Sequence, residues 1–474
     1  MTPPQTQTLR GSKLPAPAMP GASAAPAAAS APPRPAFYLT VAFVFVVYAR
    51  FPEIMDMVTG AGFHSVRIIV LLALMAALLF GGAIKAVFSR VGICMLSFTA
   101  WLCICTPFSV WRGGSFHTLR DFWALSLFSF VIIAASVQGL EQCRKIGYSL
   151  AAATIFIESF TLIMGRVQSG RLALVSGTLG NSNYLAMMLL MGVPFCLYVI
   201  RTKPGISVLK LASVLMMFLI PATVATTGSR GGLVTLAVLF ILFFLPLPLA
   251  QKIAAGICAV ILAVIAIVWS PSSALDRYRS MFVSSEESQY LTGSEQSAIE
   301  SMELRKELLL SSLQLTLRHP LMGVGPGMFA TANADYTLEI TGKEDWNAWH
   351  ETHNTFTQLS CEDGLPGLIL YCLTLLFCFK IVFAVDRRAR QYPALTSVRH
   401  IAYALRLALI AFTGTAIFAS NAYAYYFPML AGLCVALERA AKEQFALQTA
   451  AEPAAAVAAP QQVWVPGRLR PRSL

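Results

Sequence analysis

The sequence predicts an all-α membrane protein that crosses the lipid bilayer many times. Of its 474 residues, 57% are hydrophobic and only 12% are charged, whereas a soluble domain has about 25% charged residues. The apolar residues also form runs of roughly 18 to 22, the length that a helix needs to cross a hydrocarbon core of about 30 Å. Together, the composition and the run length predict a polytopic bundle.

Twelve apolar runs are the candidate membrane-spanning helices. They lie near residues 36–50, 67–84, 91–110, 119–137, 146–164, 182–200, 207–226, 231–249, 252–269, 364–385, 400–419 and 421–438. We therefore expect helices one to nine within residues 36–269 and helices ten to twelve within residues 363–440.

The chain ends and the basic residues predict the orientation. Residues 1–35 and 441–474 are of low complexity, which favours disordered segments. With the N-terminus in the cytoplasm, Lys and Arg are more numerous in the connections on its own side than in the opposite short connections. Such an excess marks the cytoplasmic face, so we expect both termini there. The basic residues are spread over many short connections, so the net charge of +12 does not indicate a nucleic-acid partner.

The ten cysteines predict neither a disulfide framework nor a redox or metal centre. Most lie inside apolar runs, where small, soft side chains pack well. No CxxC pair occurs.

One connection, residues 270–362, is far longer than the others and falls on the outer face. Such long connections are usually functional or disordered, and this one has the pattern of a helix. Ser297 and Glu300 form a candidate capping box, and Pro320 ends the pattern. Its apolar stripe is Ile299, Met302, Leu309, Leu310, Leu313 and Leu317. Arg305 lies at the stripe's edge, where it either binds a ligand or extends its charge to the membrane surface.

A turn rich in glycine follows this helix, in the stretch HPLMGVGPGMF. Its glycines allow sharp turning and a close approach to a ligand or a helix, and a tight turn is the favoured interpretation. No strand precedes it, so it is not a dinucleotide-binding loop. Arg318 and His319, just before the turn, are candidates for lining a site.

Two further segments place polar residues at predicted helix ends. TGSRGG puts Arg230 between two apolar runs. A charge at membrane depth costs roughly 2.5–3.5 kcal/mol, so it usually faces a polar cavity. The flanking glycines clear space that a simple anchor does not need, so we expect Arg230 to be functional. Upstream, Asn181 and Asn183 either bind an anion or sugar or cap the sixth helix, and the residues alone favour caps.

The stretch HETHNTF places His350 and His353 at the outer edge of the tenth helix. Glu351 lies between them, which raises the possibility of a metal site. The HExxH pattern is absent, however, and no third ligand stands out. Use of a histidine as a base or hydrogen-bond donor near neutral pH is the favoured chemistry, with a histidine packed in a loop as the alternative.

Four segments in this order resemble the O-antigen ligase family: GTLGNSNYLA, TGSRGG, HPLMGVGPG and HNTFTQLSCEDGLPGL. The similarity covers about residues 165–385. The same superfamily includes O-antigen and exopolysaccharide polymerases and protein O-oligosaccharyltransferases.

The resemblance implies glycan transfer at the periplasmic face of a bacterial inner membrane, without a metal or another cofactor. The donor would be a saccharide on undecaprenyl diphosphate, its polyprenyl chain held by the bundle in a lipid-facing groove. The acceptor would be a hydroxyl of lipid A-core or another glycan. His353 matches the family's essential histidine, with His350 as the alternative and Asn354 beside it. Arg230 and Arg305 suit paired contacts with the diphosphate leaving group.

Three other functions remain open at this stage. A polymerase of the same family shares the chemistry and differs only in its acceptor. A protein O-oligosaccharyltransferase is less favoured, because such proteins usually continue into a larger C-terminal region. A polysaccharide transporter without catalysis suits twelve spans, but transporters usually contain two similar halves, and no internal repeat is visible. A purely structural subunit would leave Arg230 and the histidines unexplained.

Overall fold

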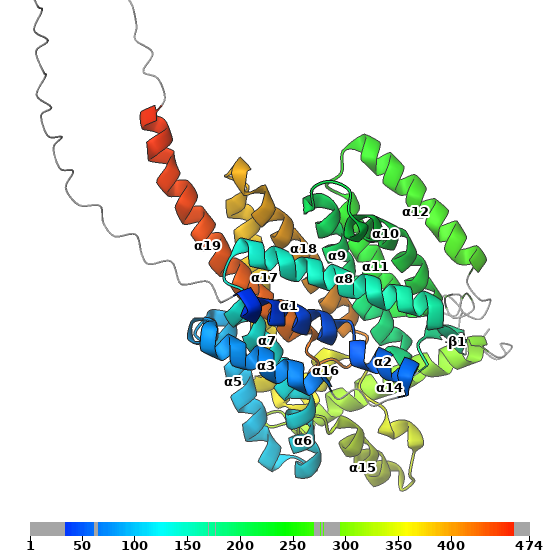
Figure 1. The fold of residues 1–474 in the computed structure, drawn as a ribbon. Helices are drawn as coiled ribbons and strands as arrows, with labels where there is room; N and C mark the ends of the chain where they lie inside the picture. Colours follow the sequence, from blue (N-terminus) through cyan, green and yellow to red (C-terminus); the bar gives the residue numbers. More distant parts are fainter. Residues whose placement is uncertain are drawn as a thin grey trace, which may run out of the picture. The chain divides into compact units, whose positions relative to one another are not determined.

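The computed structural model describes residues 34–60, 65–168, 170–175, 177–269, 275, 278 and 294–458, and these are mostly helical (Figure 1). The helices before the long connection are α1 (Arg34–Tyr48), α2 (Phe51–Thr59), α3 (Ser65–Phe80), α4 (Ala83–Val87), α5 (Arg90–Cys105), α6 (Arg112–Thr118), α7 (Ala124–Ser136), α8 (Leu140–Met164), α9 (Ser182–Thr202), α10 (Val208–Thr226), α11 (Arg230–Phe244) and α12 (Leu249–Trp269). Those within and after it are α14 (Ser294–Arg318), α15 (Phe329–Thr341), α16 (Thr355–Glu362), α17 (Gly364–Ala389), α18 (Thr396–Ala416) and α19 (Tyr426–Ala458).

Short elements join these helices. The short helical turns are η1 (Thr106–Phe108), η2 (Leu119–Trp123), η3 (Thr178–Gly180), η5 (Trp346–Trp349) and η6 (Pro393–Leu395). Between α8 and α9, β1 (Arg166–Gln168) and β2 (Arg171–Ala173) pair antiparallel, with Val167 opposite Leu172.

The helices confirm a multi-pass, all-α membrane protein. Within the described residues, seven helices are long and apolar enough to cross a membrane, or eight if α1 and α2, bent by 60°, form one span. α3, α11 and α12 have shorter apolar stretches, of 10–17 residues. The twelve predicted runs all lie largely on helices, but the count of twelve spans remains a prediction. The orientation of the termini remains one as well.

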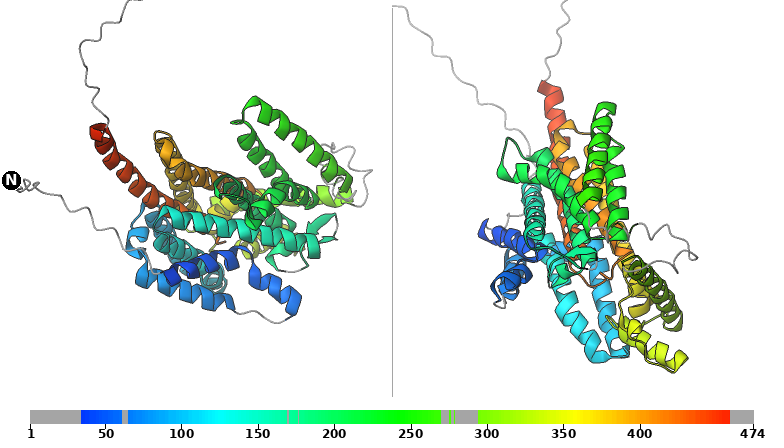
Figure 2. Two further views of the ribbon diagram at one scale, coloured as in Figure 1. Left: turned by 45° about the horizontal axis from the view of Figure 1, so that its top comes forward. Right: turned by 90° about the vertical axis from the view of Figure 1, so that its right-hand side faces the viewer.

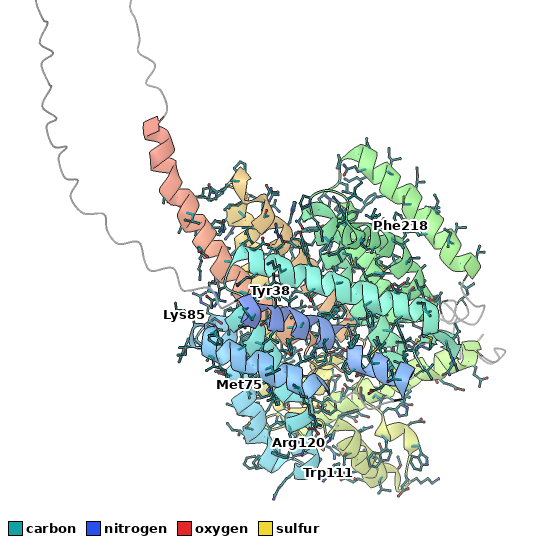
Figure 3. The ribbon with its side chains drawn as sticks, viewed as in Figure 1. Tyr38, Met75, Lys85, Trp111, Arg120 and Phe218 are labelled. Atoms are coloured by element: carbon teal, nitrogen blue, oxygen red, sulfur yellow. The ribbon has the colours of Figure 1, made fainter. Side chains whose placement is uncertain are left out.

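Apolar side chains cover much of the outer surface of the helices. Figure 3 shows Met75 and Phe218 on the outside of α3 and α10, where they are 53% and 43% exposed. Soluble monomers rarely expose contiguous apolar surfaces of this extent. Lipid therefore covers these faces.

α9 lies at the centre of the bundle. It contacts α8, α10, α11 and α18, and its residues from Leu185 to Met191 are buried. A Cβ on Gly192 would come within 1.9 Å of the Thr154 side chain, so a glycine is required for α8 and α9 to pack this closely. Figure 2 shows α12 beside α10 at the edge of the bundle.

The second half of the long connection folds around a small core of its own. Its buried apolar residues come from α14, the glycine-rich turn, α15 and α16, and they are Leu308, Leu315, Val324, Met328, Phe329, Ala332 and Cys361. Residues 294–362 are therefore a packed unit. Most of residues 270–293 lie outside the described residues.

Helix α14 differs from its predicted form in two respects. It begins at Ser294, so the expected capping box at Ser297 lies inside the helix. The predicted apolar stripe faces outward, and Leu317 on it is 80% exposed. Leu308 and Leu315 form the packed face instead, because the helix has a second apolar stripe that contacts α15 and α16.

The glycine-rich turn packs onto the junction of α16 and α17, as a tight turn. Gly323 has φ of +67°, and a Cβ there would come within 2.3 Å of the Glu362 backbone. Only glycine satisfies both the backbone angle and the space. The Val324 amide donates to the Cys361 carbonyl (2.8 Å) and the Gly325 amide to the Glu362 carbonyl (2.9 Å).

Two adjacent carboxyl groups are buried where this turn meets α17. Glu362 accepts hydrogen bonds from the amides of Gly327 (3.0 Å) and Phe329 (3.1 Å) and from the Tyr423 hydroxyl (2.8 Å). The same hydroxyl lies 3.0 Å from both carboxylate oxygens of Asp363. Because Tyr423 belongs to the α18–α19 connection, this cluster joins the long connection to the C-terminal helices.

Ionising both carboxyl groups at once is energetically costly. Burial raises the pKa of Glu362 to about 7. Burial, and then the charge of Glu362, raise the pKa of Asp363 well above its usual range. Burial and a like-charged neighbour both favour the protonated acid, so the pair retains a proton at neutral pH.

The predicted disordered tail is partly helical. α19 continues to Ala458, past residue 441, and Phe445 is buried against the bundle. The sequence is rich in Ala there, and Ala is the best helix former. The rest of the predicted tail, from residue 459, and residues 1–33 lie outside the described residues.

Substituting Tyr423→Phe is expected to lower the free energy of unfolding by roughly 1–3 kcal/mol, because it leaves buried carboxyl oxygens without their donor. Thermal unfolding of the purified protein in detergent measures the change. Tyr336→Phe is the matched control, since the Tyr336 hydroxyl bonds to Gln314 at an exposed site. Equal melting temperatures for the two variants would contradict a structural role for the buried cluster.

The wild-type protein is expected to lose stability as pH rises from about 4.5 through about 7, relative to Glu362→Gln. The folded state holds the Glu362 proton over this interval, because the pKa is raised to about 7, whereas the unfolded chain releases it near its ordinary value. Stability falls with pH when the folded state binds more protons. Melting temperatures between pH 5 and 8 check this, with Glu344→Gln, at an exposed site, as the control. Parallel curves for wild type and Glu362→Gln would refute it.

Candidate active site

Three helices begin at one end of the bundle, and each has a polar side chain that caps its first turn. Asn181 caps α9, Ser229 caps α11 and Asn354 caps α16, in each case by accepting a hydrogen bond from a backbone amide. The cap role expected for Asn181 is confirmed. Helix N-termini carry partial positive charge and favour anions, so this end of the bundle suits a negatively charged ligand.

The residue Asn183 connects the β-hairpin to α9 and α11. Its Oδ1 accepts hydrogen bonds from Arg171 Nη2 (2.8 Å) and from the Ser229 hydroxyl (2.9 Å). Arg171 Nε also donates to the Thr227 carbonyl (3.4 Å). Asn183 therefore orients the Arg171 guanidinium and is not an ordinary cap.

The histidine His353 adopts a strained backbone conformation directly before α16. Its φ is +53°, in the left-handed region that non-glycine residues seldom enter. The His353 amide donates to Ser420 Oγ (2.9 Å), which also contacts the Thr352 hydroxyl (3.1 Å). Two residues further along the chain, the Thr355 hydroxyl donates to the Ala419 carbonyl (2.7 Å). Backbone strain of this kind costs about 1–3 kcal/mol and is found mainly at functional sites.

Positive charge surrounds the His353 imidazole. Burial lowers the pKa of His353 to about 4. The charges of Arg305, His350 and Arg171 shift this pKa further in the same direction. Arg305 comes from α14 and Arg171 from β2, so two elements far apart in the sequence contribute cations near one imidazole. At neutral pH His353 is uncharged.

Arg230 occupies the first position of α11, directly after the Ser229 cap, and is half-buried. The neighbouring glycines have a different purpose from the one expected. A Cβ on Gly231 would come within 2.5 Å of the Phe418 ring, and one on Gly232 within 3.0 Å of Ala186. The glycines allow α11 to pack against its neighbours, and this packing fixes the position of Arg230.

Glu351 lies in the same loop and contacts a different set of groups. The Tyr184 hydroxyl donates to the Ser420 carbonyl (2.9 Å) and lies 3.4 Å from Glu351 Oε2. The Glu351 side chain is exposed to solvent, yet desolvation by the surrounding protein raises the pKa of its carboxyl, against the effect of hydrogen bonds from Tyr184 and Ser420.

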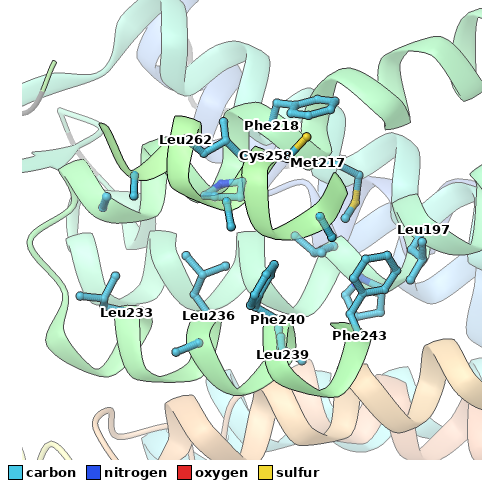
Figure 4. A pocket seen from close by; sticks show the side chains of 18 of the residues that line it. Leu197, Met217, Phe218, Leu233, Leu236, Leu239, Phe240, Phe243, Cys258 and Leu262 are labelled. Atoms are coloured by element: carbon cyan, nitrogen blue, oxygen red, sulfur yellow. The ribbon is translucent and has the colours of Figure 1, made fainter. Parts of the chain in front are cut away.

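A polar cavity adjoins this group of residues, and an apolar cavity lies among the neighbouring helices. The polar cavity, of about 430 Å³, is lined by residues that include Arg166, Gln168, Arg171 and Asn181. The apolar cavity, of about 720 Å³, lies between α9, α10, α11 and α12 (Figure 4). Its lining includes Ala225, two residues before the Thr227 carbonyl that accepts from Arg171.

The remaining predicted residues lie elsewhere or on the rim. Arg318 pairs with Glu339 (3.2 Å) and stacks on the Tyr336 ring, so its contacts are with α15. His319 and His350 are exposed. In the described ranges, no three His, Cys, Asp or Glu side chains are grouped so that they could hold a metal ion.

Sequence reasoning missed Arg171 and Ser420. Arg171 lies in a short hairpin that matches no motif. The sequence predicted only that this hairpin lies on the outer face. Ser420 lies in the stretch SNAYAYYF, whose polarity between two apolar runs was the available signal.

Comparison with known proteins identifies the central part of the chain. Residues 212–372 match the family described as O-antigen ligase. No curated protein matches the chain. The matched segment runs from α10 into α17 and includes Arg230, Arg305 and His353. The chain is thus a multi-pass membrane protein whose residues 212–372 are similar to the O-antigen ligase family.

Proposed function

We propose that the protein transfers a glycan from undecaprenyl diphosphate to a hydroxyl of lipid A-core or another glycan, at the periplasmic face of the membrane. The observation that carries this proposal is the position of a half-buried, uncharged histidine near Arg305 and Arg171, in a bundle that also contains an apolar groove. A lipid diphosphate donor needs all three parts: a groove for its chain, cations for its phosphates, and a polar group for the incoming acceptor.

The donor half of the reaction rests on the groove and the arginines. The groove lining is almost wholly aliphatic and aromatic, which suits an isoprenoid chain. Negative charge grows on the diphosphate as its bond to the sugar breaks. Arg171, Arg230 and Arg305 would stabilise that charge, with help from the N-termini of α9, α11 and α16. Arginine is suited to this because its guanidinium makes two parallel hydrogen bonds to phosphate oxygens.

The acceptor half rests on His353. A neutral imidazole forms a hydrogen bond with a hydroxyl group and holds it near the anomeric carbon of the donor. The low pKa of His353 keeps it in this form over the whole physiological range. The strained backbone and the contact with Ser420 fix where the ring lies.

A ligase and a polymerase differ only in the acceptor. A ligase uses lipid A-core, whereas a polymerase uses a second lipid-linked repeat unit. Purified protein with a polyprenyl-diphosphate-linked saccharide and each acceptor in turn distinguishes them by the size of the product on a gel. Absence of transfer to both acceptors would contradict the proposed function.

Substituting His353→Gly is expected to lower transfer by about 10²–10⁴-fold, the usual effect of removing an acid–base or hydrogen-bonding group. The melting temperature should not fall, because glycine adopts a φ of +53° without strain. His319→Ala, at an exposed position of the same long connection, should transfer at the wild-type rate. A His353→Gly protein with full activity would exclude His353 from the reaction.

Substituting Arg171→Lys is expected to reduce transfer roughly 10- to 100-fold, which corresponds to the loss of a charged hydrogen bond worth about 1.5–3 kcal/mol. The charge remains, but an ammonium group cannot make the paired contact while bonded to Asn183. Arg318→Lys, on the exposed ion pair with Glu339, is the matched control. If both variants transferred equally well, Arg171 would have no part in donor binding.

A further inference from the structure

We propose that the polar cavity between the β-hairpin and the first turn of α9 binds a phosphate group of the acceptor, with Arg166 as the residue that selects it. This inference rests on the proposed function and adds a chemical property of the acceptor: a phosphorylated acceptor is preferred to the same molecule without phosphate. Arg166 and Gln168, which line the cavity, lie outside all four sequence motifs.

The register of the hairpin places its polar side chains on one face. Arg166 lies opposite Ala173, and Gln168 lies opposite Arg171. Residues directly opposite each other in an antiparallel pair point to the same face, and so do residues two apart along a strand. All four residues line the cavity. The hairpin therefore presents a face with two arginines and an amide to the cavity.

The rest of the lining also suits an anion. Gly180, Asn181 and Ser182, at the start of α9, line the cavity, and the N-terminus of a helix carries partial positive charge. The lining contains no Asp or Glu. Its volume of about 430 Å³ falls within the usual range for small-molecule sites, about 300–1,000 Å³. The cavity thus has room for a phosphate and for part of the sugar that carries it.

The cavity adjoins the lipid-facing end of a helix. α8 ends at Met164, two residues before Arg166, and Leu162, Ile163 and Met164 are all exposed. Lipid covers such a run of exposed apolar side chains. Arg166 therefore lies close to the boundary between hydrocarbon and polar headgroups, the depth at which a phosphate of a lipid-anchored acceptor lies.

Charge balance favours the acceptor over the donor as the source of this phosphate. The proposed donor contacts use Arg171, Arg230 and Arg305. With Arg166, four arginines serve the site, whereas a diphosphate esterified at both ends carries only two negative charges. A phosphate monoester carries about −1.5 to −2 at pH 7 and matches the remaining positive charge.

The same cavity is close enough to His353 for the acceptor to reach it. Arg171 lines the cavity, and its charge acts on the His353 imidazole. A phosphate held in the cavity would therefore keep the acceptor near the histidine that orients its hydroxyl group.

The test uses the full-length protein in detergent and lipid A-core before and after enzymatic removal of its phosphate monoesters. Arg166→Gln is expected to raise the Kd and KM for the phosphorylated acceptor about tenfold, the effect of losing one charge-assisted hydrogen bond. Its kcat, its KM for the donor and its melting temperature should stay as in wild type, because Arg166 is exposed. For the dephosphorylated acceptor, wild type and Arg166→Gln should have equal Kd values. Arg318→Gln, on the exposed ion pair with Glu339, is the matched control.

Three results would overturn the phosphate site. They are equal Kd values of the wild type for the two forms of acceptor, a wild-type Kd for the phosphorylated acceptor in Arg166→Gln, and an Arg166→Gln protein whose KM rises for the donor alone. The proposed function survives all three, since the wild-type protein transfers glycan in them. Acceptor binding is measured by titration calorimetry without donor. A wild-type protein that binds the phosphorylated acceptor more tightly but transfers to neither form would therefore overturn the proposed function and not the phosphate site.

Discussion

The buried contact between Tyr423 and the adjacent carboxyl groups of Glu362 and Asp363 is the constraint on which the site depends. It ties three separate parts of the chain to one point: the glycine-rich turn, the junction of α16 and α17, and the α18–α19 connection. Helix α16 is short, so fixing its last residues also fixes its first. Those first residues hold His353 in place.

A second set of hydrogen bonds fixes the other end of α16. The α18–α19 connection meets residues 352–355 through Ser420 and Ala419, only a few residues from Tyr423. The α18–α19 connection is therefore hydrogen-bonded to both ends of α16. This double attachment explains how the backbone of His353 persists at a φ of +53°, since the surrounding contacts offset a cost of about 1–3 kcal/mol.

Much of this arrangement could be predicted from the sequence, and the failures have physical reasons. The apolar runs predicted where the helices lie, because the length of an apolar run can be read directly from the local sequence. Arg230 and His353 could be chosen because polar residues at apolar boundaries are costly and stand out. Arg171 could not, because its role follows from Asn183 and from a fold that brings the hairpin beside α9 and α10. For α14 the periodicity was visible, but the chain has two apolar stripes there, and only the partners α15 and α16 decide which one packs.

The apolar groove between α9, α10, α11 and α12 has a consequence for kinetics. Several of its lining residues, such as Phe218 and Ile267, are also exposed on the outer surface, so the groove opens towards the bilayer. A lipid-borne substrate would then reach the site by lateral diffusion and never enter the water. Its supply is set by its mole fraction among the lipids of one leaflet, so diluting the membrane with inert lipid slows the protein even when the bulk concentration of substrate is unchanged. With the proposed lipid-linked donor, the spent carrier would leave by the same opening and would compete with fresh donor for as long as it stayed in that leaflet.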